Sequence, residues 1–216
     1  MSKADATVFV VDDDEPVRDA IGMMLETVDI PFQTFASAQA FLDSYDRACH
    51  GCLVLDIRMP GMSGLELQQK LIEMRSPLPI VFITGHGDIP MAVEAMKRGA
   101  VDFIRKPFRD QDLLDRVQEA LNVEAAQRTE QDNLERIRMR VGTLTPRESE
   151  VFERVAQGQA NKVVAIDLGI SERTVEIHRS QVMQKTGART LADLVRMKLT
   201  LERAENGDPP ALDSDD

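Results

Sequence analysis

The sequence contains no long apolar segment, and it is poor in cysteine. No apolar run approaches the roughly 18 residues that a membrane-spanning helix needs, so we expect none. The two cysteines, Cys49 and Cys52, form a single CHGC pair, and no second pair is present to complete a zinc site. Leu53 stands where a haem attachment motif requires histidine. Cys52 begins an apolar segment, and we expect its thiol to pack as a small hydrophobic group.

The first residues lack the pattern of a secretory signal peptide, because polar residues lead directly into the first apolar segment. We therefore expect a cytoplasmic protein. Hydrophobic residues make up 43% of the 216-residue chain and charged residues 29%. This balance is typical of a globular protein with a buried core.

The net charge of −11 is unevenly distributed along the chain. Residues 1–125 carry a net charge of −9, residues 139–201 carry +3, and residues 202–216 carry −5. An acidic first half thus precedes a mildly basic segment and an acidic end. Only the basic segment is suited to bind a polyanion such as nucleic acid.

The first half of the chain alternates between short apolar segments and segments with helical periodicity. This alternation predicts a parallel sheet of five strands with helices on both faces, an α/β doubly wound fold. The predicted strands are residues 7–11, 31–35, 51–55, 79–83 and 101–104. The predicted helices are residues 16–28, 38–46, 64–74, 88–98 and a last one from residue 110 onward.

Residues 110–141 contain no glycine or proline. Apolar residues recur in them at spacings of three, four or more, and the middle, from Glu124 to Asn133, is polar. This pattern favours a long helix that closes the first domain and continues as a linker. A shorter helix followed by a flexible tether is the alternative, because composition permits both. We place the first domain at residues 1–122 and the linker at residues 123–142.

Residues 143–202 have an all-helical pattern and predict a second domain of four helices. Thr145, Pro146 and Glu148 have the spacing of a capping box at a helix start. Gly169 marks a turn, and Ser171 and Thr190 are suited to cap the last two helices. Residues 203–216 offer no core-forming side chains, so we expect a disordered acidic tail.

Charged residues follow three of the predicted strands at their carboxyl ends. Asp12 and Asp13 follow the first strand, Asp56 the third and Lys106 the fifth. In open α/β sheets, binding sites form at this edge. Clustered carboxylates repel one another unless a cation is bound, and oxygen ligands with open positions suit Mg²⁺. Asp56 could then accept a phosphoryl group as a nucleophile, with Lys106 neutralising its charge.

Three further features belong to this edge. Thr84 ends an apolar strand and could donate its hydroxyl to a phosphoryl oxygen. Pro107 could form a cis peptide bond with Lys106, or a trans turn. The MPGMSG loop at residues 59–64 would hold the backbone close to the site. Phe103 taken alone is more typical of a core residue than of a switch.

The segments VVDDDEPVR, LVLDIRMPGMSGLEL and VFITGHGDIPMAVEAMKRGAVDFIRKPF together resemble the receiver domain of a two-component response regulator over about residues 6–122. The resemblance implies a flavodoxin-like strand order of 2-1-3-4-5. It also implies that Asp56 accepts phosphate from a histidine kinase, and that Thr84 and Phe103 form the switch pair. Many relatives have tyrosine at Phe103, so switching through a hydroxyl is not available. The residues implied to bind Mg²⁺ are Asp12, Asp13, Asp56 and the backbone carbonyl of Arg58.

The TGHGD segment and the MPGMSG loop point to the FixJ-like branch of these regulators. In that reading the receiver catalyses only its own phosphorylation and dephosphorylation, so the chain is not an enzyme in the usual sense. A phosphatase with an aspartate nucleophile is an alternative, and sustained turnover of an unrelated phosphomonoester would favour it.

Residues 161–187 predict a helix, a tight turn and a second helix, an arrangement that can enter the major groove of DNA. Val175, Val182 and Thr186 share the predicted buried stripe of the second helix. Glu176 could accept a hydrogen bond from cytosine, or it could be a solvated helix charge. The residues that we expect to contact DNA, at bases or phosphates, are Arg173, Thr174, Glu176, Ile177, Arg179, Ser180 and Lys185.

The segments LTPRE, NKVVAIDLGIS and RTVEIHRSQVMQKTGA together resemble a LuxR-type DNA-binding domain over about residues 143–200. The two resemblances imply a transcription regulator that is phosphorylated by a sensor histidine kinase, dimerises and then binds promoter DNA. RNA polymerase is a further expected partner. A helical unit that binds another protein without DNA is the alternative, and a salt-dependent affinity for duplex DNA would argue against it.

Overall fold

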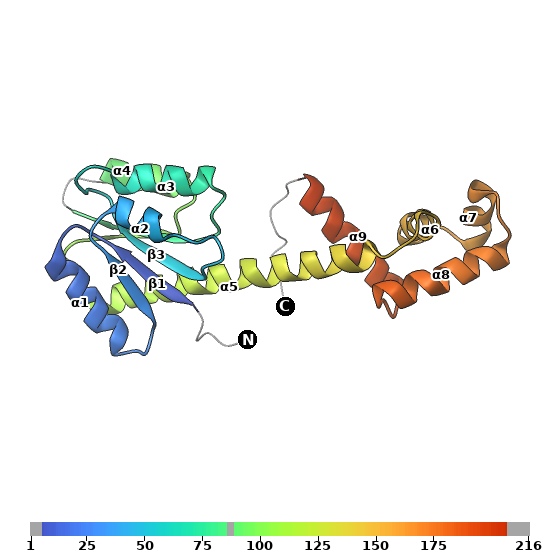
Figure 1. Ribbon diagram of the computed structural model, residues 1–216, viewed down its shortest axis with the longest axis horizontal. Coiled ribbons are helices and arrows are strands. Elements are labelled where there is room, and N and C mark those ends of the chain that lie inside the picture. Colours follow the sequence, from blue (N-terminus) through green and yellow to red (C-terminus); the bar gives the residue numbers. More distant parts are fainter. Residues whose placement is uncertain (1–5, 86–88, 207–216) are drawn as a thin grey trace. The chain divides into compact units, whose positions relative to one another are not determined.

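The structure is a computed structural model, and it describes residues 6–85 and 89–206. The chain forms two compact units, Met1–Gln127 and Arg128–Asp216, and each is described by itself below. The first unit is a sheet with helices on its two faces, and the second unit is helical (Figure 1). This is the predicted combination of an α/β doubly wound domain and an all-α domain.

Five parallel strands form the sheet of the first unit in the order β2-β1-β3-β4-β5, as predicted. Alternate residues of each strand point to opposite faces, and in the three central strands both faces are buried. Phe9 and Leu53 thus lie on one face, while Val8 and Cys52 lie on the other. The strands are β1 (Thr7–Val11), β2 (Phe32–Phe35), β3 (Gly51–Asp56), β4 (Ile80–Thr84) and β5 (Asp102–Arg105).

Helices cover both faces of this sheet because each contributes one apolar stripe. Helices α2 (Ala38–Ser44), α3 (Gly64–Glu73) and α4 (Ile89–Lys97) pack on one face. Helices α1 (Glu15–Glu26) and α5 (Asp110–Val141) pack on the other. Buried Cys52 lies on the second face as a free thiol, which confirms its predicted role as a core residue.

Helix α5 is continuous over 32 residues, so the long helix is confirmed in preference to a flexible tether. The division between the two units falls inside this helix. Glu124 is buried in the first unit, where its Oε1 lies 3.1 Å from Nδ1 of His50. Val141 packs against the core of the second unit. The segment predicted as a linker therefore contributes side chains to each unit at its two ends.

The second unit consists of the end of α5 and helices α6 (Pro146–Ala156), α7 (Asn161–Leu168), α8 (Glu172–Thr186) and α9 (Leu191–Asn206). The predicted capping box is present, because Thr145 Oγ1 accepts from the backbone of Glu148, whose side chain accepts from the backbone of Thr145. Gly169 ends α7 with a φ of 64°, a left-handed conformation that favours glycine. Ser171 caps α8 by accepting from the backbone N–H of Thr174.

One expectation about the end of the chain is wrong. Helix α9 continues to Asn206, so residues 203–206 are helical and not part of a disordered tail. Residues 201–205 (LERAE) all have high helix propensity, so the helix continues beyond its core contacts. The remaining residues of the predicted tail, 207–216, lie outside the described residues.

None of the helices in the described part of the chain combines the length and apolar character needed to span a membrane.

Candidate functional site

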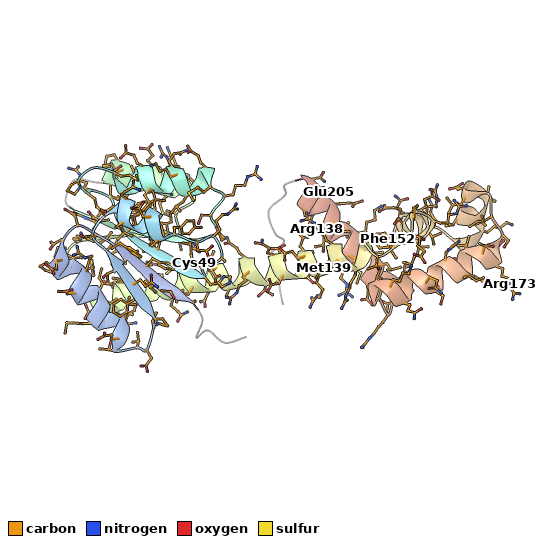
Figure 2. All side chains as sticks on the ribbon, viewed as in Figure 1. Cys49, Arg138, Met139, Phe152, Arg173 and Glu205 are labelled. Atoms are coloured by element: carbon orange, nitrogen blue, oxygen red, sulfur yellow. The ribbon has the colours of Figure 1, made fainter. Side chains whose placement is uncertain are left out.

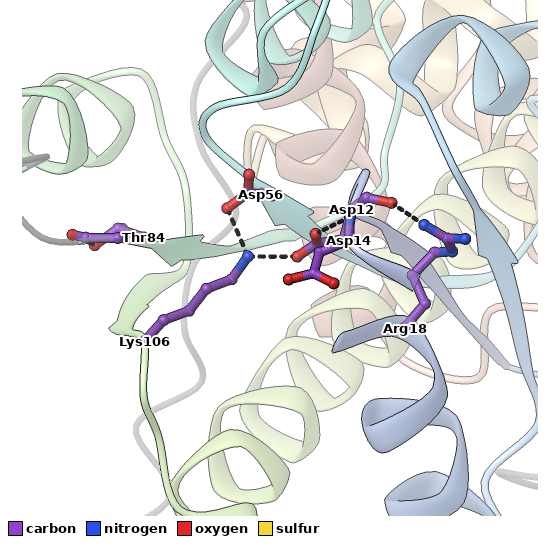
Figure 3. A network of polar contacts seen from close by, with 7 residues as sticks. Asp12, Asp14, Arg18, Asp56, Thr84 and Lys106 are labelled. Carbon is purple, nitrogen blue, oxygen red and sulfur yellow. Dashed lines mark hydrogen bonds and ion pairs between the residues drawn. The ribbon is translucent and has the colours of Figure 1, made fainter. Parts of the chain in front are cut away.

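The carboxyl ends of β1 and β3 bring two aspartates together in the first unit. Asp12 directly follows β1, and Asp56 is the last residue of β3. The two strands are paired neighbours, so these positions lie at the same edge of the sheet. Asp12 is fully buried and Asp56 nearly so, whereas Asp13 is exposed. Figure 3 shows the side chains of Asp12 and Asp56 on either side of Lys106.

Lys106 connects the two buried carboxylates. Its Nζ lies 2.6 Å from Oδ2 of Asp12 and 3.1 Å from Oδ1 of Asp56 (Figure 3). Lys106 directly follows β5, at the same edge of the sheet, and its peptide bond to Pro107 is cis. The predicted convergence of these strand-end charges is therefore confirmed.

Burial and charge oppose each other at this site. Burial raises the pKa of Asp56 from 3.8 to about 6; Lys106 lowers it and the nearby charge of Asp12 raises it. Burial lowers the pKa of Lys106, but the hydrogen bond to Asp12 and the charge of Asp56 leave that pKa above its ordinary value. The Asp56 carboxyl is thus mainly ionised at neutral pH, and the Lys106 amine is protonated.

The acidic group also has the chemistry of a site for a hard divalent cation. Asp12, Asp13 and Asp56 each offer a carboxylate oxygen, and these atoms all lie within 4.8 Å of one another. One ammonium group cannot balance three carboxylates, and oxygen ligands of this kind suit Mg²⁺. The residues present therefore fit the predicted metal. Arg58 is exposed two residues after Asp56, and the role of its carbonyl stays a prediction.

Thr84 and Phe103 occupy the neighbouring strands β4 and β5. Thr84 is buried at the end of β4, and its hydroxyl donates to the carbonyl of Gly85 at 3.4 Å. Phe103 is half-buried and packs against the core on the face covered by α2, α3 and α4. In this arrangement the Thr84 hydroxyl is bonded to the backbone rather than to Asp56. The predicted pairing of Thr84 and Phe103 as a switch stays a prediction.

Three residues support the site without having been predicted individually. The backbone N–H of Asp14 donates to Oδ1 of Asp12 at 2.9 Å, and Nη1 of Arg18 donates to the Asp12 carbonyl at 2.8 Å. Gly64 begins α3 so close to β3 that a Cβ there would lie 2.2 Å from the Asp56 carbonyl oxygen. The close backbone approach predicted for the 59–64 loop is thus confirmed at Gly64. The Arg18 contact reaches back from α1 to a residue before the helix, and it had no sequence signal.

Helix α8 in the second unit separates buried from exposed residues as predicted. Val175, Val182 and Thr186 are buried on one face. Arg173, Glu176, Ile177 and Ser180 are exposed, and Figure 2 shows Arg173 extending from the first turn of α8. Thr174 is half-buried, and its hydroxyl lies 2.7 Å from that of the capping residue Ser171. The exposed face can therefore meet a ligand without disturbing the core.

Two of the predicted DNA contacts already have protein partners. Nη1 of Arg179 donates to Oδ1 of Asn161 at 3.1 Å, which joins α8 to the first turn of α7. Nζ of Lys185 donates to Oε2 of Glu148 at 2.6 Å. The bonds from Lys185 and from the Thr145 backbone lower the pKa of Glu148 to about 2. Neither pair had a signal in the sequence, because its members lie 18 and 37 residues apart.

Two family models match the chain, one for each unit. The model of the response regulator receiver domain matches residues 8–118. The model of the bacterial regulatory proteins of the luxR family matches residues 142–198. The first match contains the acidic group and Lys106, and the second contains helices α6, α7 and α8.

Relatives extend over nearly the whole chain. The transcriptional regulatory protein FixJ of Rhizobium meliloti is 47% identical over 195 residues, which cover 90% of this chain and 96% of that protein. Nodulation protein W of Bradyrhizobium diazoefficiens is 47% identical over 201 residues, which cover 93% of this chain and 88% of that protein. Among solved structures, the response regulator StyR is similar with a TM-score of 0.82 and 45% identity, covering 90% of this chain and 98% of StyR.

The matches place both units in one kind of protein, since each relative spans the receiver and the helical domain together. The family consists of regulators and not of enzymes in the usual sense. The chain belongs to the two-component response regulators of the FixJ type, which control transcription through a receiver domain and a LuxR-type DNA-binding domain.

Proposed function

We propose that Asp56 accepts a phosphoryl group from a sensor histidine kinase and that this modification switches dimerisation and sequence-specific DNA binding. The observation that supports this most strongly is the position of Lys106. Its ammonium lies within hydrogen-bonding distance of both Asp12 and Asp56, where it can offset the charge of a group attached to Asp56.

The transfer requires an ionised carboxylate and a stabilised phosphoryl group. An Asp56 oxygen forms a bond to phosphorus while the bond from phosphorus to the kinase imidazole breaks, and the imidazole keeps the electron pair and gains a proton. Lys106 donates to a phosphoryl oxygen, because an ammonium carries three N–H donors. Bound Mg²⁺, held by Asp12, Asp13, Asp56 and the Arg58 carbonyl, would supply the remaining charge neutralisation. The same site would later release the phosphoryl group to water.

The switch would act through Thr84 and Phe103. A phosphoryl oxygen on Asp56 offers the buried Thr84 hydroxyl a charged acceptor, which is stronger than the Gly85 carbonyl that it now contacts at 3.4 Å. Movement of Thr84 toward Asp56 leaves space beside β5 that the half-buried Phe103 ring can fill. The surface formed by α4 and β5 changes with that ring, and this surface would mediate dimerisation.

The output would be DNA binding through α8. Ile177 is an exposed apolar side chain suited to a thymine methyl group, and Arg173 and Glu176 can read base edges. Thr174 and Ser180 would donate hydroxyl hydrogen bonds on the same face. Arg179 and Lys185 would reach phosphates, since each keeps N–H donors beyond those bonded to Asn161 and Glu148. A dimer would then bind two half-sites, and RNA polymerase would be the next partner.

Phosphorylation by acetyl phosphate and Mg²⁺, followed by intact mass spectrometry, tests the acceptor assignment. We expect one phosphoryl group on the wild-type chain and none on Asp56→Asn. Asp14→Asn is the matched control, because the Asp14 side chain is exposed and only its backbone N–H bonds Asp12. Incorporation by Asp56→Asn at the wild-type level would show that the acceptor is another residue.

A further inference from the structure

Arg140, near the end of α5, contacts the end of α8 within the second unit. Its Nη1 donates to the carbonyl oxygen of Thr186 at 3.3 Å. A Cβ at the next residue, Gly187, would lie 3.3 Å from the same nitrogen. Arg140 is exposed, and it forms no ion pair with any carboxylate in the part of the chain that the structure describes. Its guanidinium therefore lies over the turn between α8 and α9 without an acidic partner.

A second exposed arginine belongs to the same turn. Arg189 follows Gly187 by two residues, and its backbone N–H donates to Oδ2 of Asp193 at 3.0 Å. Its side chain forms no hydrogen bond or ion pair with any residue among those described. The nearby Lys185 differs, because its ammonium lies 2.6 Å from a carboxylate oxygen of Glu148. We call Arg140 and Arg189 the turn arginines, and two exposed charges of one sign at one turn favour an anion there.

Capping of α8 explains only part of this arrangement. A cation near the carboxyl-terminal end of a helix bonds the last carbonyl groups and stabilises the helix dipole. Arg140 does this with one N–H, and a guanidinium has five N–H donors. The Arg189 side chain caps no helix within the described ranges. A structural role therefore accounts for the position of Arg140, but it does not account for the pairing of two exposed guanidinium groups.

The length of α8 brings the turn arginines to the edge of the groove that this helix is proposed to enter. Helix α8 has 15 residues and is thus about 22 Å long, while the major groove is about 12 Å wide. A recognition helix contacts the bases with its amino-terminal residues. The carboxyl-terminal end of α8 therefore emerges beside a phosphate backbone. Guanidinium groups suit phosphates, because two parallel N–H groups can donate to two phosphate oxygens.

We propose that the turn arginines bind DNA phosphates beside the carboxyl-terminal end of α8, so that the long helix α5 contacts DNA directly. The inference rests on the proposed function, because it requires α8 to enter the major groove. It extends the DNA-binding surface to two elements outside the helix-turn-helix, the end of α5 and the turn before α9. Helix α5 also packs in the core of the receiver. The last helix of the receiver thus takes part in DNA binding through Arg140.

The salt dependence of DNA affinity tests the turn arginines, because each phosphate contact releases counterions from DNA. The full-length chain, treated with acetyl phosphate and Mg²⁺, is titrated with a fragment selected by its binding to the treated wild-type chain and with a duplex of scrambled sequence. We expect Arg140→Gln and Arg189→Gln each to reduce the slope of the logarithm of the association constant against log salt by about one. Each should weaken binding to both duplexes by the same factor, roughly fivefold at about 0.15 M salt.

Arg138→Gln is the matched control for the two variants. Arg138 is an exposed arginine of the same helix, but it lies about 200° around the helix axis from Arg140. Its substitution removes the same charge two residues away, so a general effect of net charge would appear in this variant as well. We expect it to keep the wild-type slope. The midpoint of thermal unfolding measures the capping role separately, and Arg189→Gln should keep the wild-type midpoint.

An unchanged slope in either Arg140→Gln or Arg189→Gln would overturn the inference. A lower unfolding midpoint in Arg140→Gln with an unchanged slope would show that Arg140 only caps α8. An equal reduction of the slope in Arg138→Gln would overturn the inference as well, and so would weaker binding to the selected fragment alone, which would indicate base contacts. A wild-type chain without salt-dependent affinity for any duplex would overturn the proposed function itself.

Discussion

Asp56 differs from the other two aspartates of the site in its surroundings. Asp13 is exposed to solvent, and Asp12 is held by three contacts to Asp14, Arg18 and Lys106. Asp56 is nearly buried and has Lys106 as a hydrogen-bonding partner at 3.1 Å. A carboxylate with few internal partners keeps lone pairs available for an incoming group. This difference supports the assignment of Asp56 as the acceptor.

Gly64→Ala should damage the site from the backbone side. Its Cβ would lie 2.2 Å from the Asp56 carbonyl oxygen, so either α3 or the end of β3 must move. We expect a loss of about 1–3 kcal/mol in the free energy of unfolding, typical of overpacking, and slower phosphorylation by acetyl phosphate. Urea unfolding and phosphorylation kinetics measure the two effects. Gln69→Ala, at an exposed position of the same helix, is the control, and equal behaviour of the two variants would contradict this account.

At the scale of single elements, local interactions specify most of the second unit. Thr145, Ser171 and Thr190 each accept a hydrogen bond from the backbone three residues later, as their sequence positions predicted. The first turn of α6 also bonds to another helix, because Nζ of Lys185 in α8 donates to the carboxylate of Glu148. The Glu148 carboxylate therefore caps the start of α6 and also holds the last turn of α8 against it.

Glu148 should make the free energy of unfolding of the second unit depend on pH in the acid range. The folded state holds the pKa of Glu148 at about 2, below its ordinary value of 4.5, chiefly through Lys185 and the Thr145 backbone. A lowered folded pKa stabilises the folded state above pH 4.5, and this contribution disappears as the pH falls from 4.5 toward about 2. Urea unfolding of Glu148→Gln should show a smaller loss of stability than wild type across this range. Parallel curves for the two proteins would show that the carboxylate does not contribute.

The sequence predicted those helices and strands that depend on the local pattern of apolar residues. Strands β1 and β3 appear in the sequence as short, continuous apolar segments, because the core covers both of their faces. The convergence of Asp12, Asp56 and Lys106 followed from the rule that parallel strands end at one edge. Pairs such as Arg179 with Asn161 depend on tertiary packing, so no spacing predicts them. The end of α9 was misjudged because solvent-exposed helix turns need no core residues.

At the scale of the whole molecule, charge separates the two functions along the sequence. The receiver carries the negative charge needed to hold a metal ion, and residues 139–201 carry the net positive charge suited to DNA. Helix α5 extends from the receiver into the DNA-binding unit as one continuous element. The family relationship covers about 90% of the chain and includes both units. A phosphoryl group on Asp56 is expected to act on DNA binding because both parts belong to one regulator.

A binding measurement with the full-length chain can show whether phosphorylation of Asp56 controls DNA binding. The affinity is measured for a promoter fragment selected by its binding to the phosphorylated chain. The chain is compared with and without prior treatment by acetyl phosphate and Mg²⁺. We expect treatment to lower the dissociation constant of the wild-type chain about tenfold or more. Asp56→Asn, treated in the same way, should bind DNA with the affinity of the untreated wild type. Equal dissociation constants for treated and untreated wild-type protein, or an equal response in Asp56→Asn, would contradict it.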